Sequence, residues 1–290
     1  MKRFYTAVAI VLLLAAAVQV KAENSGTRLN VFVSIPPQKY FVKEIAGNRA
    51  DIRTMVSPGA HPATYEPSAS QMAALAECDI YFAIGVPFEK AWMKKIRGAN
   101  PGIKVVYTDN WIEKQPIDRS GDSMHSRDGS DPHIWLSSPL VMIQARHILT
   151  GLIEADPKHA QIYKSGYNEF IAELAELDTK LRSFFPPAEE TKEFIVLHPS
   201  WGYFADAYGL KQIAVEAAGK SPKAGKIRRL IELARQKDIK TVLVQPQISG
   251  RTAEMIAREI DGTTVTADPL AEDWQKNLLE VARKISRAAR

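Results

Sequence analysis

Four residues that can bind a metal ion each stand beside a proline, at widely separated points of the chain. They are His61, His133, His198 and Asp268. A neighbouring proline restricts the backbone, which helps to hold each side chain in place. Three imidazoles and one carboxylate favour a borderline ion in tetrahedral geometry, so the set predicts a zinc site. Manganese would prefer more oxygen ligands, whereas copper binds imidazole more tightly than zinc does.

The spacing of these residues excludes a small zinc knuckle. They stand 72, 65 and 70 residues apart, whereas the ligands of a structural zinc site come in close pairs. Cys78 is the only cysteine, so neither a thiolate cluster nor an intramolecular disulfide can form. A lone histidine beside a loop is more often a solvated surface residue than a ligand. The metal hypothesis therefore requires a fold that brings all four residues together.

Short apolar segments alternate with helical ones along the chain, which is typical of an α/β protein with parallel sheets. His133, His198 and Asp268 are predicted at the ends of strands, and His61 follows a strand in the same way. The carboxyl ends of parallel strands are where open α/β sheets bind ligands. The predicted strands are residues 29–35, 51–56, 80–84 and 104–107, then 193–197, 211–215, 240–244 and 263–267.

A long helical segment separates the two halves. Apolar residues keep helical spacing from residue 158 to about 184, and such a helix is roughly 40 Å long. A rod that joins two lobes explains this length, and a coiled-coil surface is the alternative. We expect an N-terminal α/β lobe over 23–138, a helical segment over 139–187 and a C-terminal α/β lobe over 188–290. The two lobes are predicted to be Rossmann-like, with the metal site in the cleft between them.

Residues 1–22 have the form of a secretory signal peptide. Two basic residues precede an apolar run, and Val20-Lys21-Ala22 has the small residues of a cleavage site. The mature protein is therefore expected in the periplasm. Removal of this segment lowers Lys+Arg from 38 to 35 against 33 acids, so the net charge falls from +5 to +2. No basic stripe with interleaved aromatics is present, so nucleic acid is not an expected partner.

Residues 118–130 are rich in Gly, Ser and Asp and show no periodicity, which predicts a surface loop. His125 and the nearby aspartates could collect a metal weakly. A solvated loop with one incidental histidine is the more common case.

The candidate ligands lie within longer motifs. These are Tyr65-Glu66-Pro67-Ser68, Asp131-Pro132-His133-Ile134-Trp135-Leu136, His198-Pro199-Ser200-Trp201-Gly202-Tyr203-Phe204 with Tyr208-Gly209-Leu210, and Asp268-Pro269-Leu270. From about residue 29 to the C-terminus, the chain resembles the periplasmic metal-binding proteins of ABC transporters for zinc and manganese, the ZnuA-like and TroA-like group. The resemblance implies two α/β lobes on a rigid long helix and a metal site in the cleft. It also implies delivery of the metal to a membrane permease with a cytoplasmic ATPase, and we expect a monomer.

Residue by residue, the resemblance places His133, His198 and Asp268 at family ligand positions. Histidine rather than glutamate at position 198 is typical of the zinc-binding members. The first loop departs from the pattern, because the usual histidine is Ala63 here and His61 stands two residues earlier. In an extended chain those positions are about 6.6 Å apart, so His61 can be a ligand only if the loop runs differently. Otherwise water would complete the metal's coordination.

Two other classes of function compete with a binding protein. A zinc-dependent hydrolase would use three protein ligands, a water in the open position and Glu66 as a base. The sequence has no His-Glu-x-x-His run, no Gly-x-Ser-x-Gly elbow and no glycine-rich phosphate loop, so an enzyme is not expected. An adhesin or a binder of chelated metal would require a wide apolar cleft, on which the sequence is silent.

Overall fold

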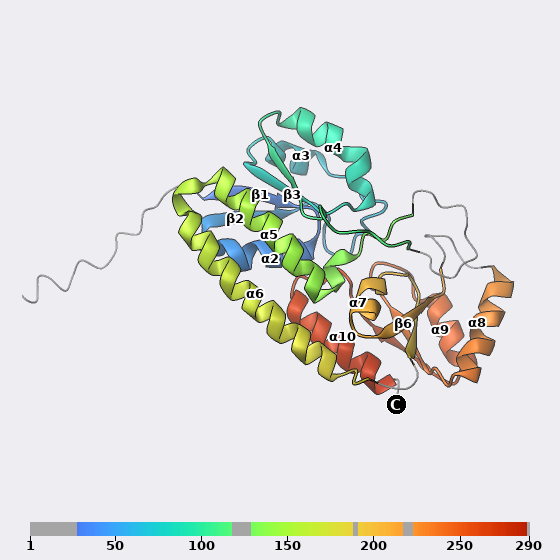
Figure 1. Ribbon diagram of the computed structural model, residues 1–290. Coiled ribbons are helices and arrows are strands. Elements are labelled where there is room, and N and C mark those ends of the chain that lie inside the picture. The colour runs from blue at the N-terminus through green and yellow to red at the C-terminus, as the bar shows by residue number, and fades with distance from the viewer. Residues whose placement is uncertain (1–27, 118–128, 188–190, 217–222, 289–290) are drawn as a thin grey trace, which may run out of the picture.

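The computed structural model describes residues 28–117, 129–187, 191–216 and 223–288. It contains two lobes, each built on a four-stranded sheet (Figure 1). The predicted signal segment and all but the end of the predicted 118–130 loop lie outside the described residues. Within the described ranges, no helix is long and apolar enough to cross a membrane.

The sheet of the first lobe is entirely parallel, in the order β2-β1-β3-β4. Its strands are β1 (Leu29–Val33), β2 (Ala50–Thr54), β3 (Ile80–Ala83) and β4 (Lys104–Tyr107). The central strands β1 and β3 are almost wholly buried, whereas no residue of the edge strand β2 is buried. This difference is expected of a parallel sheet that helices cover on both faces.

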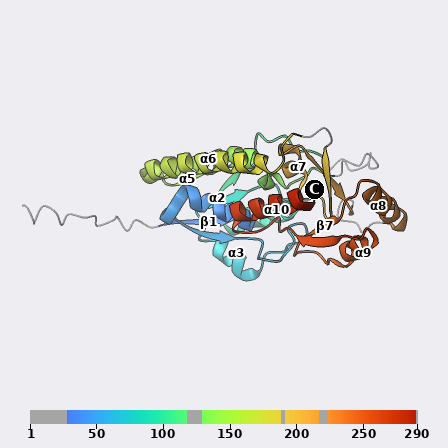
Figure 2. The same ribbon diagram turned by 90° about the horizontal axis from the view of Figure 1, so that it is seen from below.

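Helices cover both faces of this first sheet. They are α2 (Pro36–Ala46), α3 (Ala69–Leu75) and α4 (Pro87–Ala99), with a short 3-10 turn, η2 (Gly47–Arg49), after α2. Seen from below, α2 lies with the long helices on one side of β1, and α3 lies on the other side (Figure 2). α2 and α4 each begin with a proline, which suits the first turn of a helix because that turn needs no N–H donor.

The second lobe repeats the arrangement of the first. Its sheet has the order β6-β5-β7-β8 and is again entirely parallel. Its strands are β5 (Lys192–Val196), β6 (Leu210–Ala214), β7 (Thr241–Val244) and β8 (Thr263–Thr266), and its helices are α7 (Gly202–Ala207), α8 (Ala224–Gln236) and α9 (Arg251–Glu259). The prediction of two α/β lobes with parallel sheets is therefore confirmed.

Two long antiparallel helices connect the lobes. They are α5 (Ser138–Ala155), preceded by η3 (Ile134–Leu136), and α6 (Ala160–Ser183). The predicted long helix is present, but α6 has 24 residues rather than 27. Residues 157–159 form a 3-10 turn, η4 (Pro157–His159), instead of its first turn. The carboxylate of Asp156 accepts hydrogen bonds from His159 and Tyr163, which stabilises this turn ahead of α6.

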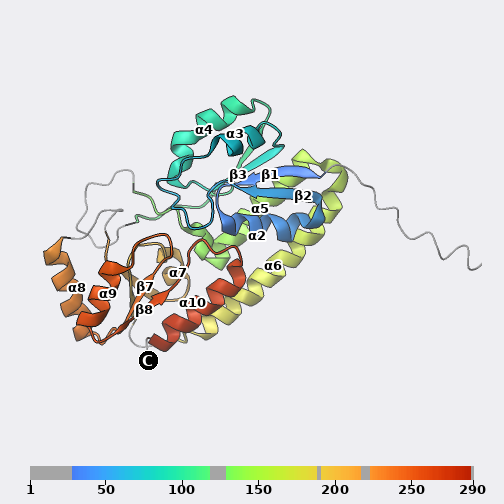
Figure 3. The same ribbon diagram turned by 180° about the vertical axis from the view of Figure 1, so that it is seen from behind.

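The C-terminal helix, α10 (Trp274–Ala288), lies alongside α6 between the two lobes (Figure 3). One continuous apolar core extends through the first lobe, α5, α6 and α10 and into the second lobe. A separate apolar cluster holds α8 and α9 on the second sheet. The lobes therefore share a core, which fixes the position of one sheet relative to the other.

Candidate metal site

Three of the four candidate ligands lie in one cavity between the lobes. The cavity has a volume of about 600 Å³, and His61, His133 and His198 are among the residues that line it. The ring centres of His61 and His198 are 5.3 Å apart, and those of His133 and His198 are 5.5 Å apart. His198 is therefore the middle member of a cluster of three imidazoles, drawn from loops of both lobes.

The ring spacing suits a shared metal ion. Two imidazoles bound to one tetrahedral zinc through bonds of about 2.0 to 2.1 Å hold their ring centres roughly 5 Å apart. However, among the described residues no three His, Cys, Asp or Glu side chains already stand in a metal-holding arrangement. The side chains are gathered in one place, and binding an ion requires them to adjust.

Asp131 orients the imidazole of His133. Its carboxylate accepts one hydrogen bond from the backbone N–H of His133 at 2.9 Å and another from Nδ1 of the ring at 2.6 Å. Both residues are buried, with Asp131 1% and His133 8% exposed. An ionised carboxylate only accepts hydrogen bonds, so the ring proton is on Nδ1 and the lone pair is on Nε2. Carboxylate–histidine pairs of this kind are common beside protein metal ions.

The prediction that His133 ends a strand is wrong. It precedes η3, and within the described residues the bridge nearest to it is the one between Pro116 and Ser130. In the described part of this loop, residues 131–133 belong to no strand. The loop is fixed instead by individual hydrogen bonds, from Asp131 N to Gln115 O at 2.7 Å and from the Tyr203 hydroxyl to Asp131 O at 3.0 Å.

His198 stands two residues after the end of β5, as predicted. Its Nδ1 lies 3.2 Å from Oε2 of Glu216, which follows β6 and also lines the cavity. The imidazole is 8% exposed. Both His133 and His198 therefore have a carboxylate on Nδ1.

His61 reaches the cavity although it stands two residues from the usual family position. Its Nδ1 accepts a hydrogen bond from the backbone N–H of Ala63 at 3.1 Å. Burial lowers the pKa of His61 to about 4, and the neighbouring His198 and His133 add to this effect. The imidazole is therefore neutral at pH 7, which is the form that binds metals.

Asp268 follows β8, as predicted, but it is not among the described residues that line the cavity. Its Oδ1 accepts hydrogen bonds from Nε2 of Gln247 at 2.7 Å and from the backbone N–H of Leu270 at 2.9 Å. The next two residues, Pro269 and Leu270, do line the cavity. The structure thus brings three of the predicted ligands together and leaves the fourth just outside.

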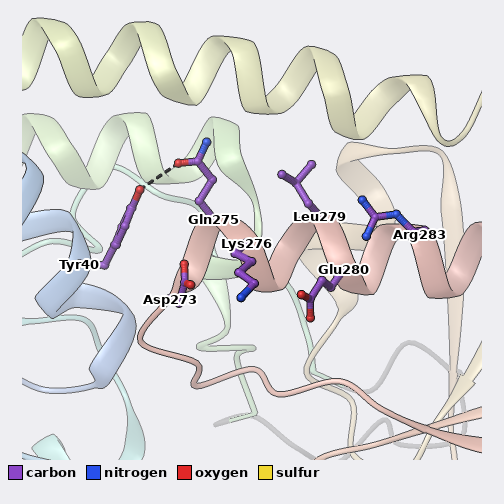
Figure 4. Close-up of a pocket in the computed structure, with 7 residues that line it drawn as sticks. All are labelled: Tyr40, Asp273, Gln275, Lys276, Leu279, Glu280 and Arg283. Carbon is purple, nitrogen blue, oxygen red and sulfur yellow. Dashed lines mark hydrogen bonds between the residues drawn. The ribbon is translucent and has the colours of Figure 1, made fainter.

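Other features bear on what the cavity can do. Trp135 and Trp201 are buried, and Trp135 forms part of the cavity wall. Glu66, the base of the hydrolase alternative, is exposed and does not appear among the described lining residues. A second cavity of about 410 Å³ lies along α10 beside Tyr40, and it is lined by none of the histidines (Figure 4).

Sequence reasoning missed two residues of the site, Asp131 and Glu216. Asp131 stands two positions before His133, a spacing at which a loop carboxylate can bond back to the following backbone and ring. That signal was present in the sequence. Glu216 had no such local signal, because its contact with His198 depends on how β5 and β6 pair.

Comparisons with known proteins agree with this architecture. The family described as "ZnuA: Zinc-uptake complex component A periplasmic" matches residues 31–288. The high-affinity zinc uptake system protein ZnuA of Bacillus subtilis is 26% identical over 262 residues, covering 86% of this chain and 81% of that protein. The manganese-binding lipoprotein MntA of Halalkalibacterium halodurans is 25% identical over 257 residues, covering 86% and 83%.

Solved structures extend the comparison to three dimensions. A crystal structure of ZnuA is 37% identical to this chain, with a TM-score of 0.85, and the match covers 91% of this chain and 100% of that one. The family match spans most of the sequence, and the described lobes carry the same fold. The chain therefore belongs to the ZnuA family of periplasmic zinc-uptake components.

Proposed function

We propose that this protein captures a divalent transition metal, most simply zinc, and delivers it to the membrane permease of an ABC transporter. The observation that carries the proposal is the cluster of His61, His133 and His198 in one cavity between the lobes. Imidazoles at this spacing suit zinc. Membership of the ZnuA family and the zinc-uptake relative of Bacillus subtilis support the same function.

The three histidines are the proposed nitrogen ligands, and Asp268 is the proposed fourth ligand. The hydrogen bonds from Gln247 and Leu270 both go to Oδ1 of Asp268, so Oδ2 is the oxygen proposed to bind the metal. Pro269 and Leu270 already line the cavity, so a small movement of this loop would bring the carboxylate in. If it does not move, water completes the shell.

Zinc is proposed over manganese because of the donor atoms. Three imidazoles give a nitrogen-rich set of ligands, which zinc binds in four-coordinate sites. Manganese prefers oxygen ligands such as carboxylates and water. The relative MntA is named as a manganese-binding protein, so membership of the wider group does not by itself choose the metal. The histidine at position 198 is the residue that favours zinc.

A transport role is proposed rather than catalysis. The hydrolase alternative needs a base beside the metal, and Glu66 is exposed and away from the cavity wall. Most of the described lining residues are apolar, such as Val86, Trp135 and Leu270, and the carboxylate among them, Glu216, lies 3.2 Å from Nδ1 of His198. Such a pocket suits the capture of an ion more than the binding and cleavage of a substrate.

The proposed place of action is the periplasm, with the permease as the partner and a monomer as the active form. The basis is the signal-like segment at residues 1–22 together with family membership. Nucleic acid is not a proposed partner, since the mature net charge is only +2 by the count given above.

The test is a zinc titration of the purified mature protein by isothermal calorimetry, with manganese in parallel. One tight zinc per chain, and weaker manganese binding, is the expected result. His133→Ala should abolish tight zinc binding, because it removes a buried ligand held by Asp131, and the fold should remain. His147→Ala is the matched control, because His147 is only partly buried, donates to the Asn110 carbonyl and is not among the residues that line the cavity. Equal zinc affinity of wild type and His133→Ala would refute the site.

A further inference from the structure

The pairing of two strands places Glu216 beside His198. In the β5–β6 ladder each residue lies opposite one 18 positions later, from Lys192 with Leu210 to Val196 with Ala214. The same offset joins His198 and Glu216. Beyond the ladder, the backbone N–H of Glu216 donates to the carbonyl of Leu197 at 3.0 Å. Residues opposite each other on adjacent strands are about 4.8 Å apart, so the two side chains leave the sheet edge as neighbours.

The contact determines which nitrogen of His198 can meet a metal. Oε2 of Glu216 lies 3.2 Å from Nδ1, and an ionised carboxylate can only accept a hydrogen bond. The ring proton is therefore held on Nδ1, and Nε2 keeps its lone pair. Without the carboxylate, a neutral imidazole would distribute its proton between the two nitrogens.

The second pair in the cavity has the same design. Asp131 accepts a hydrogen bond from Nδ1 of His133 at 2.6 Å, so this ring also presents Nε2. The rings of His133 and His198 are 5.5 Å apart. One carboxylate comes from a loop of the first lobe and the other from the end of β6, so each lobe orients its own histidine. His61 differs, because its Nδ1 accepts from a backbone N–H.

We propose that Glu216 is a positioning residue of the metal site, which holds His198 with its proton on Nδ1 and its Nε2 toward the bound ion. This inference rests on the proposed function and deepens it. Glu216 acts through His198 and does not itself bind the metal. The backbone N–H of Glu216 already anchors this segment to the carbonyl of Leu197. The side chain is not needed for that anchoring, so its contact with His198 is a separate role.

Two variants of Glu216 test whether its hydrogen bond to His198 raises the affinity for zinc. Glu216→Ala removes the acceptor, whereas Glu216→Gln keeps a side-chain oxygen that can still accept from Nδ1. Loss of such a partner lowers metal affinity by about 10- to 100-fold. We therefore expect a zinc affinity reduced by this factor in Glu216→Ala, with most of it restored in Glu216→Gln. Glu232→Ala, which removes an exposed carboxylate of α8, is the matched control and should leave zinc affinity unchanged.

The tautomer is measured directly by nitrogen NMR of ¹⁵N-histidine-labelled protein without metal. The ring of His198 should carry its proton on Nδ1 in wild type and Glu216→Gln, and lose this preference in Glu216→Ala. Thermal unfolding verifies that each variant is folded. Because this readout needs no metal, it still decides the Glu216–His198 relation if the wild type proves not to bind zinc, a result that would refute only the proposed function.

Two results would overturn the proposal. An unchanged His198 tautomer and unchanged zinc affinity in Glu216→Ala would mean that the side chain has no role at the site. Zinc affinity as poor in Glu216→Gln as in Glu216→Ala, with the Nδ1 tautomer retained in Glu216→Gln, would mean that the carboxylate binds the metal directly.

Discussion

The indole N–H of Trp274 donates a hydrogen bond of 2.7 Å to the backbone carbonyl of Trp135, across the boundary between α10 and the loop that carries His133. The indole of Trp135 in turn donates to the carbonyl of Pro269 at 2.6 Å. These two bonds connect the segment of His133 to the segment that follows Asp268. The geometry of the cavity therefore depends on residues that do not line it.

Trp274→Phe is expected to destabilise the protein and to weaken zinc binding. Phenylalanine keeps most of the apolar volume but leaves the Trp135 carbonyl without its donor. An unsatisfied buried polar group costs about 1 to 3 kcal/mol, and the loss would be measured by urea unfolding. Trp92→Phe is the control, since Trp92 is only half-buried in α4. Equal losses of unfolding free energy in the two variants would contradict the linking role of Trp274.

Gly166→Ala is expected to destabilise the contact between α6 and α2. A Cβ at position 166 would lie 2.6 Å from the backbone oxygen of Ile45 and 2.8 Å from that of Glu44. Backbone atoms cannot move aside like a flexible side chain, so the helices must separate. Gly98→Ala in α4 is the matched control, because a Cβ there meets nothing within 4 Å.

The two substitutions should therefore have opposite signs. In an open helix position, alanine is favoured over glycine by up to about 1 kcal/mol, which is the gain expected for Gly98→Ala. Urea unfolding of the two variants measures both changes. A stabilised Gly166→Ala would show that α6 and α2 do not need their close approach.

His61→Ala is expected to lower zinc affinity by more than about 100-fold, because residues that only support a ligand already contribute 10- to 100-fold. Ala63 lines the same cavity, so adding Ala63→His to this variant should restore much of the affinity. Calorimetric zinc titrations of the single and double variants test both points. Affinity unchanged in His61→Ala would instead assign that coordination position to water.

The stability of the first lobe is expected to depend on the protonation of Glu89. Burial raises the pKa of Glu89 to about 7, although hydrogen bonds from Ser34, Ile84 and Gly85 oppose part of the shift. The folded protein thus holds this proton more tightly than the unfolded chain, in which a glutamate titrates near pH 4.3. The contribution to stability is complete below about pH 4.3 and is lost as the pH rises to about 7.

Urea unfolding of wild type and Glu89→Gln across pH 4 to 8 measures this contribution. The wild-type free energy of unfolding, relative to that of Glu89→Gln, should fall by at most about 3 kcal/mol between pH 4.3 and 7. Glutamine does not titrate, so it removes this dependence and leaves that of the other groups. Parallel pH profiles of the two proteins would exclude a raised pKa at Glu89.

The sequence by itself determined the elements and most of the candidate ligands. Alternating strands and helices, the long apolar stripe of α6 and a histidine two residues after β5 are local patterns in the sequence, which side-chain periodicity reveals. The hydrogen bond between Asp131 and His133 could also have been predicted from the sequence, since the two residues stand two positions apart in one loop.

Only the tertiary structure decided which of these residues meet. The approach of His61 to His198 depends on a loop that bends differently from an extended chain, and the contact of Glu216 with His198 depends on the register of β5 and β6. Asp268 is the opposite case, a predicted ligand that does not line the cavity. Its Oδ1 instead accepts hydrogen bonds from Gln247 and from the backbone N–H of Leu270. Such contacts join residues far apart in the chain, so packing and strand pairing fix them, and no local pattern in the sequence records them.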